Sequence, residues 1–211
     1  MNYVSVQNND SNTHLLYSYR RCPYAMRARM ALIDSQINFD LYEISLKNKP
    51  HEMLSISPKG TVPVLKVGNK VIDESINIMI WAYENGNSSH YANYNADLIK
   101  IGLNLIKTND NEFKLCLDQY KYAINHSIKT KGELRTACLF FIEILEERLK
   151  QKRYLLSDEV SFVDIAIAPF IRQFANVDLE YFSSLKFFRV QIWLLAYTRS
   201  ELFINAMIKP T

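Results

Sequence analysis

Residues 14–35 read HLLYSYRRCPYAMRARMALIDS, and this stretch decides the fold. Its first six residues are mostly apolar and aromatic, which is typical of a β-strand. Cys22-Pro23 then opens a helical run, where proline is tolerated because its missing N–H would have no partner in the first helical turn. A strand that passes into a helix, with a cysteine at the junction, predicts the start of a βαβ unit.

The residues that follow continue this alternation of strand and helix. The expected elements are a strand at 39–44, a short helix or turn at 50–56, strands at 64–67 and 70–72, and a helix capped by Ser75 that runs to about Glu84. Gly68-Asn69 is a good two-residue hairpin turn between the last two strands. A right-handed crossover and a mixed sheet are therefore expected within a domain that spans residues 13–85.

The remainder of the chain has a different pattern. Residues 1–12 are polar and are expected to be flexible. Residues 86–95 are polar and predict a linker, and residues 96–211 have helical spacing almost throughout. Ser161 and Asp164 are spaced like a capping box, with aspartate in place of the usual glutamate or glutamine. We therefore expect a second, all-helical domain.

Composition limits the classes of function. The chain has 211 residues, 48% hydrophobic content and a net charge of +3, and its basic residues are scattered. These values do not indicate nucleic-acid binding, and no apolar stretch is long enough to span a membrane. Because the cysteine number is odd and no CxxC pair occurs, a disulfide scaffold is not expected. A cytoplasmic protein without membrane or nucleic-acid partners fits best.

Cys22 is the residue best placed to carry chemistry. At a helix N-terminus the unpaired N–H groups and the helix dipole favour a negative charge, and Arg20, Arg21 and Arg27 add positive potential. Such settings lower the pKa of a cysteine and make it a nucleophilic thiolate. The alternative is an inert buried cysteine, which is the preferred interpretation for Cys116 and Cys138 on helical apolar faces.

Two further groups of residues have both a structural and a functional interpretation. Val62-Pro63 precedes a strand and is either an ordinary trans turn or a cis pair that aims the Val62 backbone at an extended peptide. Glu74-Ser75 lies at a helix start and is either a plain cap or a site for an α-amino acid end. In the second case the Ser75 hydroxyl and nearby N–H groups hold a carboxylate, and Glu74 holds an ammonium.

Together these segments resemble the glutathione transferases of the cytosol, and most closely their cysteine-type, omega-like class. The similar segments are YSYRRCPYAMRARMAL, LKNKPHEMLSISPKGTVPVL, IDESINIM and SFVDIAIAPF, which occur in the order and at the spacing of that class. The resemblance implies a thioredoxin-like βαβαββα domain, followed by an all-helical glutathione transferase domain. It also implies glutathione as cosubstrate, no metal, and a homodimer.

The resemblance also assigns roles to individual residues. It makes Cys22 the catalytic residue, which forms a mixed disulfide with glutathione. Val62 pairs with the cysteinyl part of glutathione, and Pro63 is the cis-proline. Glu74 and Ser75 hold the γ-glutamyl end.

Two more residues complete the glutathione-binding set that the resemblance implies. Lys49 reaches the glycyl carboxylate, although taken alone it reads as a solvated surface lysine. Tyr24 stands where the class has an aromatic residue near the glutathione sulfur. Ala25 stands where dithiol glutaredoxins have a second cysteine, so a second glutathione must resolve the mixed disulfide.

Several functions remain open at this point. The favoured one is a glutathione-dependent thiol transferase or reductase that acts on a disulfide or small electrophilic acceptor. The second is a conjugating transferase that stabilises the thiolate of glutathione through the hydroxyl of Ser18 or Tyr19. The third is non-enzymatic, because RYLLSDEVSFVDIAIAPF also resembles the stringent starvation family that binds RNA polymerase. A purely structural module of the same fold is the fourth.

Overall fold

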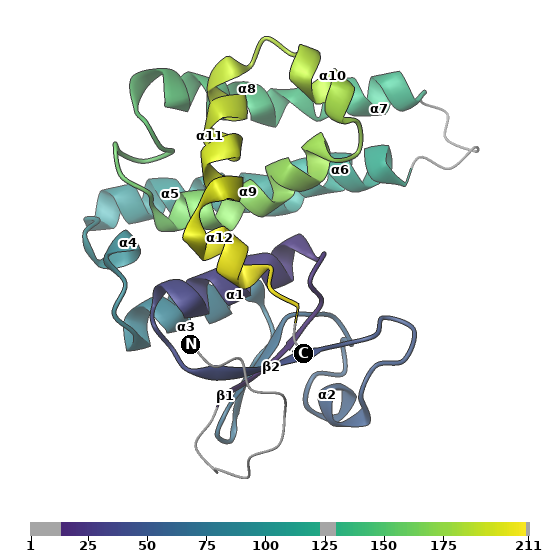
Figure 1. Ribbon diagram of the computed structural model, residues 1–211, viewed down its shortest axis with the longest axis vertical. Coiled ribbons are helices and arrows are strands. Elements are labelled where there is room, and N and C mark those ends of the chain that lie inside the picture. Colours follow the sequence, from purple (N-terminus) through teal and green to yellow (C-terminus); the bar gives the residue numbers. More distant parts are fainter. Residues whose placement is uncertain (1–13, 123–129, 210–211) are drawn as a thin grey trace. The chain divides into compact units, whose positions relative to one another are not determined.

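The computed structural model describes residues 14–122 and 130–209 (Figure 1). The segment 1–12, expected to be flexible, lies outside the described residues. The described residues form two compact units. One consists of the described parts of Met1–Ser89 and Ser200–Thr211, and the other of those of His90–Arg199. The expected domain boundaries at residues 13–85 and 96–211 remain predictions.

The first unit is built on a four-stranded mixed sheet. Its strands are β1 (His14–Ser18), β2 (Phe39–Glu43), β3 (Val64–Val67) and β4 (Lys70–Ile72). Their order is β2-β1-β3-β4, where β1 and β2 are parallel and the other pairs are antiparallel. Gly68 has a φ of 55° in the turn between β3 and β4, which glycine adopts readily. The expected mixed sheet and hairpin are confirmed.

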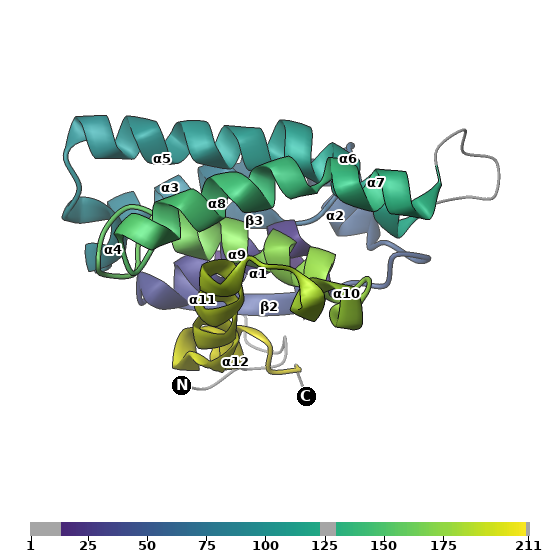
Figure 2. The same cartoon turned by 90° about the horizontal axis from the view of Figure 1, so that it is seen from above.

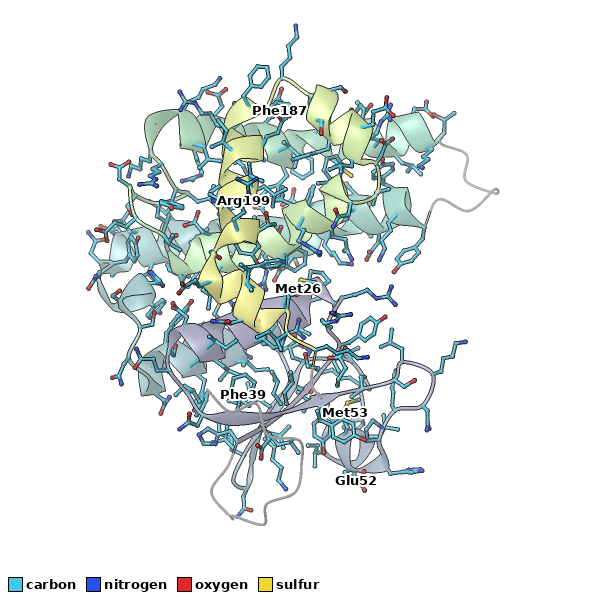
Figure 3. All side chains as sticks on the ribbon, viewed as in Figure 1. Met26, Phe39, Glu52, Met53, Phe187 and Arg199 are labelled. Carbon is cyan, nitrogen blue, oxygen red and sulfur yellow. The ribbon has the colours of Figure 1, made fainter. Side chains whose placement is uncertain are left out.

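Helices cover both faces of this sheet. They are α1 (Pro23–Asp34), α2 (His51–Ile56) and α3 (Ser75–Asn85), while another helix of this unit, α12 (Glu201–Ala206), packs against α1. Because side chains alternate along a strand, Tyr17 and its partner Val64 share one face, where they form a core cluster with Met53 of α2. Met53 is buried, whereas its neighbour Glu52 is exposed (Figure 3).

The opposite face of the sheet carries α1 and α3, which pack side by side (Figure 1). Ser18 of β1 points to this face and accepts a hydrogen bond from Arg29 Nη1 of α1 at 2.6 Å. The order β1-α1-β2-α2-β3-β4-α3 is that of the expected thioredoxin-like domain. The fold prediction for this part of the chain is therefore confirmed.

One detail of the helix start is different from the prediction. Ser75 was expected to cap α3, but Glu74 occupies the N-cap position and Ser75 is the first helical residue. The Ser75 hydroxyl accepts a hydrogen bond from Arg27 Nη1 at 3.2 Å. The Ser75 side chain, which the local sequence predicts to be the cap, instead makes a tertiary hydrogen bond with Arg27.

In the described residues of the second unit all regular secondary structure is helical, as expected. Its helices are α5 (Ala96–Thr108), a π-helical turn η1 (Asn109–Phe113), α6 (Lys114–Lys121), α7 (Lys131–Ala137), α8 (Leu139–Gln151), α9 (Phe162–Ala175), α10 (Leu179–Ser184) and α11 (Phe188–Arg199). The short helix α4 (Ser89–Ala92) lies within the stretch expected to be a linker. Every residue of α9 except Arg172 and Gln173 is buried, and α5, α6, α10 and α11 pack against this helix (Figure 2).

The start of α9 is fixed by the predicted capping box. The Ser161 hydroxyl and the Asp164 carboxylate each bond to the other's backbone N–H. Asp164 Oδ1 also accepts hydrogen bonds from the Leu155 N–H at 3.0 Å and from Trp193 Nε1 at 2.8 Å. One buried carboxylate therefore joins the helix start, the preceding loop and α11.

In the part of the chain that the structure describes, no helix is both long and apolar enough to cross a bilayer.

Candidate functional site

Cys22 lies at the N-terminus of α1, as the sequence predicts. It is the N-cap residue, with extended backbone angles (φ −79°, ψ 123°), and its carbonyl accepts the N–H of Met26 at 2.9 Å. The side chain is half-buried, and none of the three cysteines is in a disulfide. The Cys22 thiol donates to the Val62 carbonyl, with an Sγ–O distance of 3.8 Å. The thiol is thus placed beside the first turn of a helix and a backbone polar group.

The contact between Cys22 and Val62 follows from the sheet. β1 and β3 are antiparallel neighbours, so the loop after β1 meets the segment that enters β3. Val62 is half-buried and Pro63 is buried, and the peptide bond between them is cis. Sequence reasoning left the choice between cis and trans open, and the structure has the cis form.

Lys49 packs against the loop that leads to Val62. In this loop Gly60 has a φ of 63°, a conformation that side chains other than glycine rarely adopt. A Cβ at Gly60 would lie 3.5 Å from Lys49 Nζ and 3.2 Å from Leu54 Cδ2. The ammonium of Lys49 is therefore close to the backbone two residues before Val62.

Ser75 and Tyr24 are connected through a buried arginine. Arg27 is fully buried in α1 and donates from Nη1 to the Ser75 hydroxyl, 48 positions along the chain. Its Cζ lies 5.7 Å from the centroid of the Tyr24 ring. Arg27 was expected to add positive potential near Cys22, and the structure shows that it bonds to Ser75 at the start of α3.

Glu74 is exposed and belongs to a small network of charged residues. Its Oε1 lies 2.5 Å from Lys59 Nζ, and the same ammonium lies 3.3 Å from Asp73 Oδ1. The hydrogen bond to Glu74 is the main reason why the pKa of Lys59 is raised. Asp73 also accepts a hydrogen bond from the Ser57 hydroxyl at 3.0 Å.

The two hydroxyls considered for the conjugating alternative have different environments. Ser18 is fully buried and accepts a hydrogen bond from Arg29. The Tyr19 hydroxyl accepts from Arg21 Nη2 at 2.8 Å and from Arg21 Nε at 3.1 Å. Of these two hydroxyls, only that of Tyr19 is in an exposed hydrogen bond.

Sequence reasoning missed two residues of the site, Arg27 as the partner of Ser75 and Lys59 as the partner of Glu74. A lysine in a polar turn carries no signal of its own, and the burial of Arg27 cannot be recognised from a helical pattern.

Within residues 14–122 and 130–209, no group of three or more His, Cys, Asp or Glu residues is arranged to hold a metal ion.

Comparison with models of protein families shows to which family the chain belongs. The model of the N-terminal domain of glutathione S-transferase matches residues 16–90, and that of the C-terminal domain matches residues 139–199. The chain belongs to the glutathione S-transferase superfamily. The two matches account for most of the chain and cover the site described above.

The relatives of this chain differ in the share of its residues that they match. A probable glutathione S-transferase, MSR-1 of Nicotiana plumbaginifolia, is 27% identical over 190 residues, which are 80% of this chain and 77% of the relative. Glutathione S-transferase omega-2 of Rattus norvegicus is 43% identical over only 51 residues, which are 24% of this chain and 21% of the relative. The omega-like class is therefore not established by these relatives.

Solved structures show the same fold. A glutathione transferase family member from Pseudomonas fluorescens, solved with two glutathione molecules bound, superimposes with a TM-score of 0.82 at 14% identity. The match covers 95% of this chain and 94% of that chain. The thioredoxin-like domain and the helical domain of this protein thus form a glutathione transferase fold.

Proposed function

We propose that this protein is a glutathione-dependent thiol transferase of the omega-like type, in which Cys22 forms a mixed disulfide with glutathione. The observation that carries the proposal is the place of the Cys22 thiol, at the first turn of α1 and 3.8 Å from the Val62 carbonyl. A helix N-terminus favours the thiolate, and thiolates rather than thiols attack disulfides.

The tripeptide fits residues that the fold brings together. The Val62 backbone pairs with the cysteinyl part of glutathione next to Cys22, and Pro63 fixes the direction of that segment. Tyr24 lies beside the sulfur, and Lys49 meets the glycyl carboxylate.

The start of α3 receives the other end of the ligand. Ser75 and the N–H groups of this helix hold the γ-glutamyl carboxylate, because the positive end of a helix binds anions. Glu74 holds the ammonium of the same group. Because the N-terminus of α3 is positive and Glu74 is negative, the carboxylate and the ammonium of the γ-glutamyl end each have a defined place.

The reaction consists of two thiol–disulfide exchanges. The Cys22 thiolate attacks the glutathione sulfur of a glutathionylated acceptor, which forms a Cys22–glutathione disulfide and releases the acceptor as a thiolate. The thiolate of a second glutathione then attacks the glutathione sulfur of this disulfide and regenerates Cys22, with oxidised glutathione as product. Ala25 offers no resolving thiol in the first turn of α1, so the second glutathione is needed. A homodimer in the cytoplasm is part of this proposal.

Removal of the Cys22 thiol tests the proposal. The mixed disulfide of glutathione and 2-mercaptoethanol serves as substrate, and NADPH consumption is followed with glutathione reductase. Cys22→Ser is expected to reduce the rate to the uncatalysed background, whereas Cys116→Ser in α6 keeps the wild-type rate. Full activity of the Cys22→Ser protein would exclude the mechanism.

The environment of Tyr19 supports a second candidate, the conjugating transferase. Two donors of Arg21 reach the Tyr19 hydroxyl, and a charge-assisted hydrogen bond of this kind can place a phenol to stabilise a glutathione thiolate. Conjugation of glutathione to 1-chloro-2,4-dinitrobenzene distinguishes the two. If that activity persists in Cys22→Ser and is lost in Tyr19→Phe, the second function holds. A protein that neither reacts nor binds glutathione is a non-enzymatic member of the fold.

A further inference from the structure

We infer that Lys59 is an internal competitor for Glu74: its ammonium occupies the place that the α-ammonium of a γ-glutamyl ligand takes. Lys59 thereby lowers the affinity for glutathione and reduces the preference for ligands that carry this ammonium. The inference rests on the proposed function, because it assumes that Glu74 binds the γ-glutamyl end.

The geometry shows an ammonium already at the carboxylate. Lys59 Nζ lies 2.5 Å from Glu74 Oε1, a distance at which the pair forms a charge-assisted hydrogen bond. The ammonium is also 3.3 Å from Asp73 Oδ1, so it bridges the two acidic residues before α3. A lysine ammonium and the α-ammonium of an amino acid are the same chemical group, so Lys59 Nζ stands in for the ligand in this contact.

The backbone that carries Lys59 is held close to Glu74. Lys59 lies in the turn between α2 and β3, where the Gly60 N–H donates to the Ser57 carbonyl at 3.0 Å. The Ser57 hydroxyl in turn donates to Asp73, the neighbour of Glu74. The turn and the helix start are therefore tied together, and Lys59 reaches Glu74.

The pair is nevertheless open to exchange. The side chains of Lys59 and Glu74 are 49% and 59% exposed, and ion pairs in contact with water are weak. A ligand ammonium that approaches Glu74 either displaces Lys59 or lies beside a like charge, and both outcomes weaken binding. Asp73 can retain Lys59 after exchange, so the lysine need not move far.

This arrangement predicts a gain of affinity on mutation. Lys59→Met removes the competitor and keeps the aliphatic part of the side chain. We expect it to tighten glutathione binding by about two- to fivefold, in line with the modest strength of exposed ion pairs. Glutaryl-cysteinyl-glycine, which is glutathione without its amino group, gains nothing from the same substitution because it has no ammonium to place at Glu74.

The test is calorimetric titration of the full chain with both ligands under reducing conditions. Lys66→Met is the matched control, since Lys66 is an exposed lysine of β3 and its loss changes the net charge equally. The expected result is tighter binding only for glutathione and only in Lys59→Met. Unchanged or weaker glutathione binding in Lys59→Met overturns the inference, as does an equal gain for the analogue or for Lys66→Met.

A further variant separates failure of the inference from failure of the proposed function. Glu74→Gln should weaken glutathione binding in the wild-type background, and Lys59→Met should give no gain once Glu74 is replaced. If the wild-type protein does not bind glutathione, the proposed function fails and the inference fails with it. If glutathione binds but Glu74→Gln has no effect, Glu74 does not hold the ammonium, and the inference fails while the role of Cys22 stands. If only the gain in Lys59→Met is missing, the proposed function stands and Lys59 is not a competitor.

Discussion

The hydrogen bond with Arg27 determines where the hydroxyl hydrogen of Ser75 can point. A guanidinium has only donors, so in the contact with Arg27 the serine oxygen must accept. The hydroxyl hydrogen is then left to point at another acceptor. At the start of α3, a ligand carboxylate is such an acceptor, so Arg27 acts as a positioning residue for the proposed γ-glutamyl site.

Replacement of Arg27 should therefore act through Ser75. We expect Arg27→Met to weaken glutathione binding by about 1.5–3 kcal/mol, the scale of one charged hydrogen bond. In the double variant with Ser75→Ala the loss should be little larger than in either single variant, because both remove the same interaction. Calorimetric titration of the four proteins measures this coupling.

A nearby buried arginine supplies the control. Arg29 lies in the same helix but bonds to Ser18 and to the Ala206 carbonyl. Arg29→Met should lower the free energy of unfolding, while its effect on glutathione binding adds to that of Ser75→Ala. Full additivity for Arg27 and Ser75 would instead show that Arg27 has only a structural role.

At the scale of residues, local patterns were informative and tertiary partners were not. The position of Cys22 at a helix start could be predicted from the residues next to it in the sequence, and the structure confirms that position. The partners of Ser75 and Glu74 lie 48 and 15 positions away, and their contacts exist only after the sheet has formed. The glutathione-binding roles of these residues remain predictions.

At the scale of elements, one helix caps another. Glu146 of α8 is buried, and its carboxylate accepts the backbone N–H groups of Arg189 at 3.2 Å and Val190 at 2.9 Å. These N–H groups belong to the first turn of α11, which begins at Phe188, next to the residue labelled Phe187 in Figure 3. A side chain from a different helix thus satisfies donors that have no partner within α11.

Loss of this contact should destabilise the second unit. Glu146→Ala is expected to reduce the free energy of unfolding by about 1–3 kcal/mol, because it leaves the buried N–H of Val190 without its acceptor in the first turn of α11. Glu147→Ala is the control, since its side chain is 65% exposed and pairs with Lys150 at the surface. That change should cost no more than about 0.5 kcal/mol. Equal losses in urea denaturation would contradict the capping role.

The difference between caps formed by neighbouring residues and caps formed by distant residues explains which helix starts could be predicted. The capping box of α9 is local, with Ser161 and Asp164 three positions apart, and sequence spacing identified it. Trp193 Nε1 also bonds to Asp164, but across 29 positions, and this contact had no signal in the sequence. The cap of α11 likewise depends on Glu146, 43 or more positions before the N–H groups it accepts.

At the scale of the molecule, two cysteines report on two units. Cys22 lies half-buried in the first unit, whereas Cys138 is fully buried in the second, where burial and the nearby Cys116 raise its pKa to about 12. At pH 8 the folded protein keeps Cys138 protonated and unreactive. In the unfolded chain a cysteine has a pKa of about 8.5, so a substantial fraction becomes thiolate.

Thiol labelling should therefore separate the two units. With Ellman's reagent at pH 8, Cys22 should react in the native protein, and Cys138 only after the second unit unfolds. Labelling of the Cys116→Ser variant across a urea series, with peptide mapping of each site, gives both curves. Reaction of Cys138 in the absence of urea at the rate of Cys22 would contradict the burial that raises its pKa.

The place of α12 has a consequence for how the chain is made. Arg29 Nε binds the Ala206 carbonyl at 2.9 Å, so a helix close to the end of the chain belongs to the unit that the early residues build. A ribosome releases the thioredoxin-like segment long before it releases this helix. The first unit can therefore complete its packing only after α12 has been made, whereas the described helices of the second unit all precede α12 along the chain.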